Sequence, residues 1–291
     1  MGNRKREQLA AYLFLSPSIA SFALFILLPA VMGMGLSFFQ WDLTSPPQFA
    51  GMSNWLEFAD NQEAIASIKT TLLFVALSLP LTIVVGLALA LLVNRIPLGK
   101  GFFRSSFFLP SITSMVAMSV IWSNIYGRET GLLNYLLGLA GIPQVDWLSD
   151  PSTALFSIVL FSIWHSAGYN MLIFLAGLQG IDETLYEAAK VDGAGPLYMF
   201  RKITLPLLSP TMFFIVITSV IGNLQSFEAV YLLTGGGPGY STTTLVYFIV
   251  NAAFKGFNMG LAATISTVLF ALIAVVTILQ WKLQEKWVHY N

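Results

Sequence analysis

Long apolar runs separated by short polar segments dominate the chain. Six of them approach or exceed the roughly 20 apolar residues that a membrane-spanning helix needs. These runs are 11–39, 70–93, 105–126, 153–177, 210–233 and 261–281. They are continuously apolar rather than alternating, which predicts helices and not the strands of a barrel. We therefore expect an all-α integral membrane protein with six transmembrane helices.

A seventh apolar segment, Thr243–Phe254, has only about 12 residues and predicts a short interfacial or re-entrant helix. Pro17 and Pro29 lie inside the first run and predict kinks there. No polar stretch is long enough for a soluble domain. We expect one membrane domain over 11–281, with short tails at 1–10 and 282–291.

Basic residues predict the orientation. The first run follows Arg4-Lys5-Arg6, and its apolar part is longer than that of a cleaved signal peptide, which favours an uncleaved anchor. With the N-terminus in the cytoplasm, eleven Lys and Arg fall on inner segments. The outer segments then carry Lys69, Arg128 and Lys255. This bias predicts that both termini are cytoplasmic.

The composition agrees with a membrane protein and narrows its chemistry. Charged residues make up 10% of the chain, against about 25% in soluble domains. A net charge of zero gives no electrostatic case for nucleic acid, and the absence of cysteine excludes disulfides and thiolate catalysis. His165 and His289 are too few and too far apart for a metal site. We expect no catalytic residues, no metal and no cofactor in this chain.

A polar segment between the fourth and fifth runs predicts a surface helix. Asp182 is suited to cap its N-terminus, with Glu183 in the first turn. Spacings of three and four residues place a small apolar face on one side, formed by Leu185, Ala188 and Ala189. Gly193 and the Gly195-Pro196 pair then end the helix.

The same segment carries a recognisable motif. It reads Glu187-Ala188-Ala189, then Gly193, then Ile203-x-Leu205-Pro206. This resembles the E-A-A loop of binding-protein-dependent ABC importers, through which the membrane subunit binds its ATPase. The alternative is an ordinary amphipathic surface helix. The resemblance implies a cytoplasmic coupling helix within 182–206 and five ATPase-coupling residues: Glu187, Ala188, Ala189, Asp192 and Gly193.

Two polar stripes run along the apolar runs that flank this segment. They are Ser162, His165, Ser166 and Tyr169 on the fourth run, and Ser219, Gly222, Asn223 and Ser226 on the fifth. Each set follows the spacing of one helical face. Polar stripes at membrane depth are expected where a hydrophilic solute crosses. The competing interpretation is helix–helix packing, because Ser, Gly and Asn also serve that purpose.

The chain also resembles the membrane subunits of carbohydrate-type ABC importers, which include the maltose and glycerol-3-phosphate systems. The resemblance covers essentially all six runs and is strongest from Trp164 to Phe254. The resemblance includes Leu232–Pro238 and Thr242–Thr244. It implies a type I importer fold in which a sugar contacts the two stripes. Four stripe residues differ in side chain from the maltose-type subunit: His165, Ser166, Gly222 and Ser226.

The resemblance also implies partners. They are a second homologous permease subunit, two ATPase subunits that bind ATP and Mg, an extracytoplasmic solute-binding protein, and the lipid of a bacterial or archaeal cytoplasmic membrane.

The glycine run Gly235–Gly239 has no following Lys-Ser/Thr and is a turn rather than a phosphate loop. The solute expected is a di- or oligosaccharide, a glycoside or a polyol, with a glycerol-3-phosphate-type permease as the alternative.

Glu228 is the only charged residue inside an apolar run. Nine residues separate it from Ser219, which predicts the helical face opposite the stripe and a contact with a partner subunit or the membrane interface. An ion-driven secondary transporter would need several such charges and an inverted repeat. A membrane-embedded enzyme would need clustered His, Asp or Glu, whereas only His165 and Glu228 lie within the runs.

Overall fold

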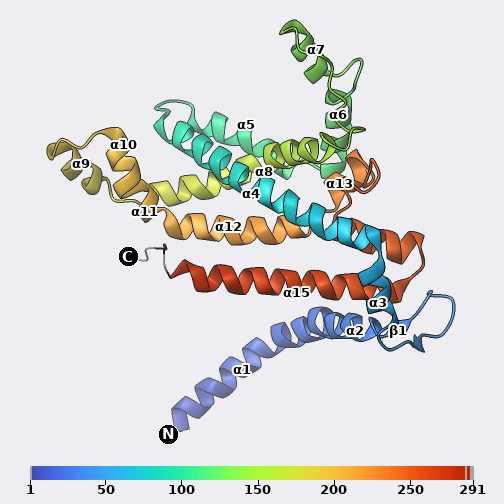
Figure 1. Cartoon of the computed structure of the whole chain (residues 1–291). Coiled ribbons are helices and arrows are strands. Elements are labelled where there is room, and N and C mark those ends of the chain that lie inside the picture. Colours follow the sequence, from blue (N-terminus) through green and yellow to red (C-terminus); the bar gives the residue numbers. More distant parts are fainter. Residues whose placement is uncertain (1, 286, 289–291) are drawn as a thin grey trace. The chain divides into compact units, whose positions relative to one another are not determined.

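The computed structural model describes residues 2–285 and 287–288 and is mostly helical (Figure 1). Within this described part, four helices are long and apolar enough to cross a membrane, and the number rises to six when each of two bent pairs counts as one span. Met1 of the predicted tail 1–10, and residues 286 and 289–291 of the predicted tail 282–291, lie outside the described residues.

The chain divides into two compact units, of which the first comprises the part up to Asn61 together with Phe248–Phe270. The first predicted run forms α1 (Gly2–Phe22), a π-helical turn η1 (Ala23–Leu27) and α2 (Leu28–Leu36). The π turn lies just before Pro29, which lacks an N–H and whose ring crowds the carbonyl four residues earlier. The irregularity predicted at Pro29 therefore takes the form of a widened turn, whereas α1 continues through Pro17.

A short antiparallel hairpin follows, in which β1 (Phe39–Gln40) pairs with β2 (Gln48–Phe49). The next helix, α3 (Ser53–Asp60), is fixed by the fully buried Asn54, whose Nδ2 donates to the carbonyls of Ser37 and Phe39, both at 2.9 Å. Helix α15 (Met259–Gln284) begins against the same hairpin. A Cβ on Gly260 would lie 2.2 Å from the Phe39 carbonyl oxygen, so only glycine permits this approach.

The second unit comprises Gln62–Tyr247 and the part from Ala271 onward. Its central helices are α4 (Gln62–Arg95), α8 (Ala154–Gln179) and α12 (Ser209–Leu224), which pack side by side (Figure 1). Their buried side chains form two apolar clusters, one around Phe74 and Phe161 and one around Met171 and Phe174. Helices that are apolar on most sides are buried in this way or face lipid.

The third predicted run, 105–126, is a bent pair rather than one straight helix. Helices α5 (Lys100–Ile112) and α6 (Met115–Ile125) meet at 96°. The bend follows Pro110, and Thr113 has the extended backbone φ −82°, ψ 147°. Helix α5 lies very close to α8, because a Cβ on Gly168 would come within 1.9 Å of the Phe107 carbonyl oxygen.

The fifth predicted run, 210–233, is also interrupted. A short helix α10 (Pro196–Met199), a π turn η2 (Phe200–Thr204) and α11 (Leu205–Leu207) lead into α12 at an angle of 62°. Helix α12 ends at Leu224, and α13 (Glu228–Leu233) begins after a break.

The predicted short helix at Thr243–Phe254 forms α14 (Leu245–Val250) and the π turn η3 (Asn251–Lys255). It remains too short to count as a span.

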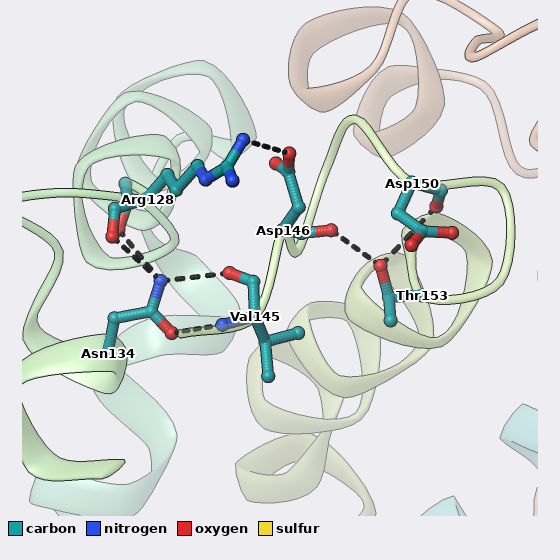
Figure 2. Close-up of polar contacts among 7 residues, drawn as sticks. Arg128, Asn134, Val145, Asp146, Asp150 and Thr153 are labelled. Atoms are coloured by element: carbon teal, nitrogen blue, oxygen red, sulfur yellow. Dashed lines mark hydrogen bonds and ion pairs between the residues drawn. The ribbon is translucent and has the colours of Figure 1, made fainter. Parts of the chain in front are cut away.

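The predicted outer loop 127–152 is ordered around Asn134 of α7 (Leu132–Leu139), as Figure 2 shows. Asn134 Nδ2 donates to the carbonyls of Arg128 (2.9 Å) and Val145 (2.8 Å), and its Oδ1 accepts from the Val145 N–H at 3.0 Å. Arg128 Nη1 pairs with Asp146 Oδ2 at 3.2 Å, and Thr153 Oγ1 donates to the Asp146 carbonyl at 2.6 Å. One buried amide thus joins both arms of the loop.

Candidate functional site

Six of the eight predicted stripe residues line one pocket of the second unit. They are Ser162, His165 and Ser166 on α8, and Gly222, Asn223 and Ser226 on and just beyond α12. The pocket has a volume of about 360 Å³. The two predicted stripes therefore face a common space. Helical spacing predicts this for the residues within α8 and α12, whereas Ser226 lines the pocket from the break that follows Leu224.

The other two stripe residues, Tyr169 and Ser219, are not among the residues that line this pocket. Tyr169 lies one turn beyond Ser166 on α8, with 50% of its surface exposed. Ser219 lies one turn before Gly222 on α12 and is half-buried. Their place on a solute pathway stays a prediction.

Asn223 has a second role that the sequence pattern did not reveal. Its Nδ2 donates to Ser78 Oγ on α4 at 2.8 Å, and Ser78 Oγ in turn donates to the Phe74 carbonyl at 2.6 Å. Ser78 is fully buried. Asn223 therefore lines the pocket and also links α12 to α4. Its position is compatible with both interpretations of the stripe, as a solute pathway and as a helix–helix packing surface.

His165 connects the pocket to the bend between α5 and α6. Its Nε2 lies 3.5 Å from the carbonyl oxygen of Thr113, the residue at the bend. The backbone carbonyl of His165 accepts a hydrogen bond from Ser111 Oγ at 2.6 Å. The imidazole is thus placed by α8 and oriented beside the end of α5.

Glu228 also lines the pocket, so the prediction that it lies on the opposite helical face is wrong. The prediction carried the 3.6-residue period from Ser219 through to Glu228, but α12 ends at Leu224 and a new helix starts at Glu228. Helical phase is lost across such a break. Glu228 is the only charged side chain among the lining residues, which include no Lys or Arg.

The coupling segment forms the predicted helix, α9 (Glu183–Val191). Asp182 caps it, with Oδ1 accepting from the Thr184 N–H at 2.9 Å. This backbone hydrogen bond lowers the pKa of the Asp182 carboxyl, because it stabilises the charged form. The capped carboxylate at the start of the helix is the arrangement that the dipole favours.

The helix ends in a Schellman motif. Gly193 has a φ of +79°, its N–H donates to the Lys190 carbonyl at 3.0 Å, and the Ala194 N–H donates to the Ala189 carbonyl at 2.8 Å. The left-handed conformation favours glycine. A Cβ on Gly193 would meet no other atom within 4 Å. Glycine is therefore favoured here by the backbone conformation and not by a lack of space for a side chain.

The two sides of α9 differ. Tyr186 OH and Thr204 Oγ1 are hydrogen-bonded at 2.9 Å, which fixes α9 to the turn η2 that leads into α12. On the other side Leu185, Ala188 and Val191 are exposed, Val191 with 88% of its surface. Ala189 is half-buried. Helix α9 therefore presents an exposed apolar face that nothing in the described part of the chain covers. The same helix is hydrogen-bonded to the turn that leads into α12.

Comparison with known proteins places the chain in a family. Residues 82–289 match the family described as the binding-protein-dependent transport system inner membrane component. Because this match covers more than half of the chain, the protein belongs to that family, whose members are integral inner-membrane permeases of ABC transporters.

Curated relatives extend over nearly the whole chain. The probable ABC transporter permease protein YesP of Bacillus subtilis is 36% identical over 292 residues, covering 99% of this chain and 94% of its own. The trehalose/maltose transport system permease protein MalF of Thermococcus litoralis is 35% identical, with 95% and 94% covered. The lactose transport system permease protein LacF of Rhizobium radiobacter is 36% identical, with 93% and 92% covered.

Solved structures agree on the fold. A chain of a bacterial ABC transporter involved in the import of the acidic polysaccharide alginate superposes with a TM-score of 0.84, at 24% identity and with 98% of both chains covered. Another structure of an alginate transporter, in complex with a periplasmic protein that holds an alginate pentasaccharide, gives a TM-score of 0.82 at 25% identity, with 97% and 96% covered. The predicted all-α permease fold is confirmed.

Proposed function

We propose that this permease carries a neutral sugar or sugar-like solute, and that the pocket between α8 and α12 lies on its path. The observation that supports this most is the pocket itself, in which Ser162, His165, Ser166 and Asn223 come together. Hydroxyl, imidazole and amide groups both donate and accept hydrogen bonds. A hydroxyl-rich solute needs such partners once it leaves water, because an unpaired buried hydroxyl is costly.

The charge of the pocket favours a neutral solute over an anionic one. One relative, the sn-glycerol-3-phosphate transport system permease protein UgpA of Yersinia pestis, is 34% identical, with 96% of this chain covered, which keeps that substrate class as a second candidate. However, the only charged lining group is the Glu228 carboxylate. A carboxylate repels a phosphate ester, whereas a disaccharide, glycoside or polyol has no charge to be repelled.

The coupling segment supports the rest of the proposed cycle. We infer that α9 presents its apolar face to an ATPase subunit on the cytoplasmic side, and that ATP and Mg are bound there and not by this chain. A second permease subunit completes the pathway, and a solute-binding protein delivers solute from outside. Closure of the ATPases on ATP moves α9, and the link from Tyr186 to Thr204 transmits this movement to α12.

Co-purification and ligand identification test this proposal together. The tagged permease, extracted in mild detergent, is expected to bring down an ATPase of separate sequence and a second permease. The partner binding protein, purified without added ligand, is expected to release a neutral saccharide or polyol that mass spectrometry can identify. Recovery of a phosphate ester, or of no ATPase under conditions that keep the subunit folded, would contradict the proposal.

The orientation is tested by site-directed labelling. The chain contains no cysteine, so a single introduced thiol is the only one that reacts. Thr184→Cys on α9 and Ser149→Cys in the loop 127–152 both lie at exposed positions. We expect a membrane-impermeant maleimide to label the Ser149→Cys variant in intact cells and the Thr184→Cys variant only in inverted vesicles. The reverse pattern would overturn the cytoplasmic position of α9.

A further inference from the structure

The break between α12 and α13 forms one wall of the pocket. Gln225, Ser226 and Phe227 lie in the break, Glu228 follows it, and all four line the pocket. The position of these groups therefore depends on how the break is held. Within a continuous helix each carbonyl is satisfied by an N–H four residues later, but at a break such carbonyls need other donors.

Three consecutive buried threonines lie near this wall in the sequence order Thr242–Thr244, and the hydroxyl of one of them donates a hydrogen bond to the break. Thr242 Oγ1 donates to the Gly237 carbonyl at 2.8 Å, and Thr243 Oγ1 donates to the Gly236 carbonyl at 3.0 Å. Thr244 Oγ1 instead donates to the carbonyl of Ser226 at 2.8 Å. All three side chains are fully buried, and none of them lines the pocket.

Thr244 is itself held from two directions. Its Oγ1 accepts a hydrogen bond from the Tyr247 N–H at 3.4 Å, which makes Thr244 a side-chain cap on the first turn of α14. The next residue, Leu245, donates its N–H to Thr71 Oγ1 on α4 at 2.9 Å. Both Thr71 and Leu245 are fully buried. The hydroxyl that contacts the break is thus fixed to α4 and α14.

We propose that Thr244 is a positioning residue for the transport pocket: its hydroxyl fixes the Ser226 carbonyl and thereby places Ser226 and Glu228 against the pocket. That this placement matters for solute rests on the proposed function, but the placement itself does not. A valine at this position has nearly the shape of threonine and cannot donate. Thr244→Val therefore removes the hydrogen bond to the break, together with the weaker one that caps α14, while leaving the packing almost unchanged.

Thiol reactivity measures the placement without knowledge of the solute. In the assembled transporter, a Ser226→Cys variant reports on the break and a Ser162→Cys variant reports on the same pocket from α8. The probe is a small methanethiosulfonate reagent. We expect Thr244→Val to change the reaction rate at position 226 on the order of fivefold, as the loss of one hydrogen bond in a local equilibrium does. The rate at position 162 is expected to stay unchanged.

Two variants separate a positioning role from a general loss of stability. Thr244→Ser keeps the hydroxyl and is expected to restore the original rate at position 226. Thr242→Val removes an equally buried hydroxyl two residues away, one that binds the glycine turn, and is expected to leave that rate unaltered. Equal effects of Thr244→Val and Thr242→Val, or a rate at 226 that does not respond to Thr244→Val, would overturn the proposal.

The proposed function is tested separately with the same thiols. Maltose, trehalose and lactose are each added with the partner binding protein and ATP, and protection of Ser226→Cys from the reagent is measured. Protection by none of them, with a normal response to Thr244→Val, would count against these sugars as solutes and leave the positioning role intact. Protection by one of the sugars, without any response to Thr244→Val, would support the proposed function and overturn the positioning role of Thr244.

Discussion

Replacing Gly193 with proline is expected to abolish solute uptake while the subunit still inserts in the membrane. Gly193 has a φ of +79° in the turn that ends α9. Proline fixes φ near −65° and has no N–H, so the hydrogen bond from Gly193 to the Lys190 carbonyl is lost as well. The measurement is uptake per assembled complex, together with the amount of ATPase that co-purifies.

A matched substitution distinguishes conformation from contact at the same position. Asparagine tolerates the left-handed region, and a Cβ at Gly193 meets open space, so Gly193→Asn is expected to retain most of the uptake. Ala188→Trp changes the exposed apolar face without changing the backbone, and we expect it, like Gly193→Pro, to abolish uptake and to weaken ATPase association. Normal uptake by the Gly193→Pro or Ala188→Trp variant at normal expression would contradict the proposal that α9 couples the permease to the ATPase.

The second large effect is expected along the proposed solute path, at Asn223 in the pocket and at Tyr169, which lies beyond the pocket on α8. Asn223→Leu and Tyr169→Ala are each predicted to lower uptake on the order of tenfold or more, because a solute hydroxyl left without a partner costs about 1–3 kcal/mol. Basal ATP hydrolysis and assembly are expected to be retained, since neither residue lies on α9. The measurement is initial uptake rate normalised to assembled complex, with ATP hydrolysis followed in parallel.

Ser78→Ala is the control that the structure supplies for Asn223. It removes the hydrogen bond between α12 and α4, but Ser78 is fully buried and does not line the pocket. If Asn223 serves the solute, Ser78→Ala retains much more uptake than Asn223→Leu. If the two variants lose uptake equally, or lose assembly rather than uptake, the stripe on α12 is a packing interface and the pathway assignment fails there.

Local rules predicted those parts of the site that lie within unbroken helices. On α8 the spacing of Ser162, His165 and Ser166 placed all three in one pocket. At α9 the cap at Asp182 and the end near Gly193 follow from residue chemistry over a few positions. Each of these inferences requires only that the helical period continue for one or two turns.

The same rules failed where the chain changes direction or makes distant contacts. Glu228 was placed on the wrong face because Gln225–Phe227 contains neither glycine nor proline to signal the break. The pairing of Asn223 with Ser78 joins residues 145 positions apart, and no single-sequence pattern encodes it. The contact of Thr244 with Ser226 is of the same kind: it depends on tertiary packing.

The loop organised by Asn134 has a consequence for any protein that docks on it. A free loop of this length samples many conformations, and a partner that binds one of them must restrict the rest, which weakens association. Here the amide of Asn134 and the Arg128–Asp146 ion pair restrict the chain beforehand. The part of the chain that these contacts hold loses its conformational entropy when the permease folds, and a docking partner meets a surface whose conformation is already selected.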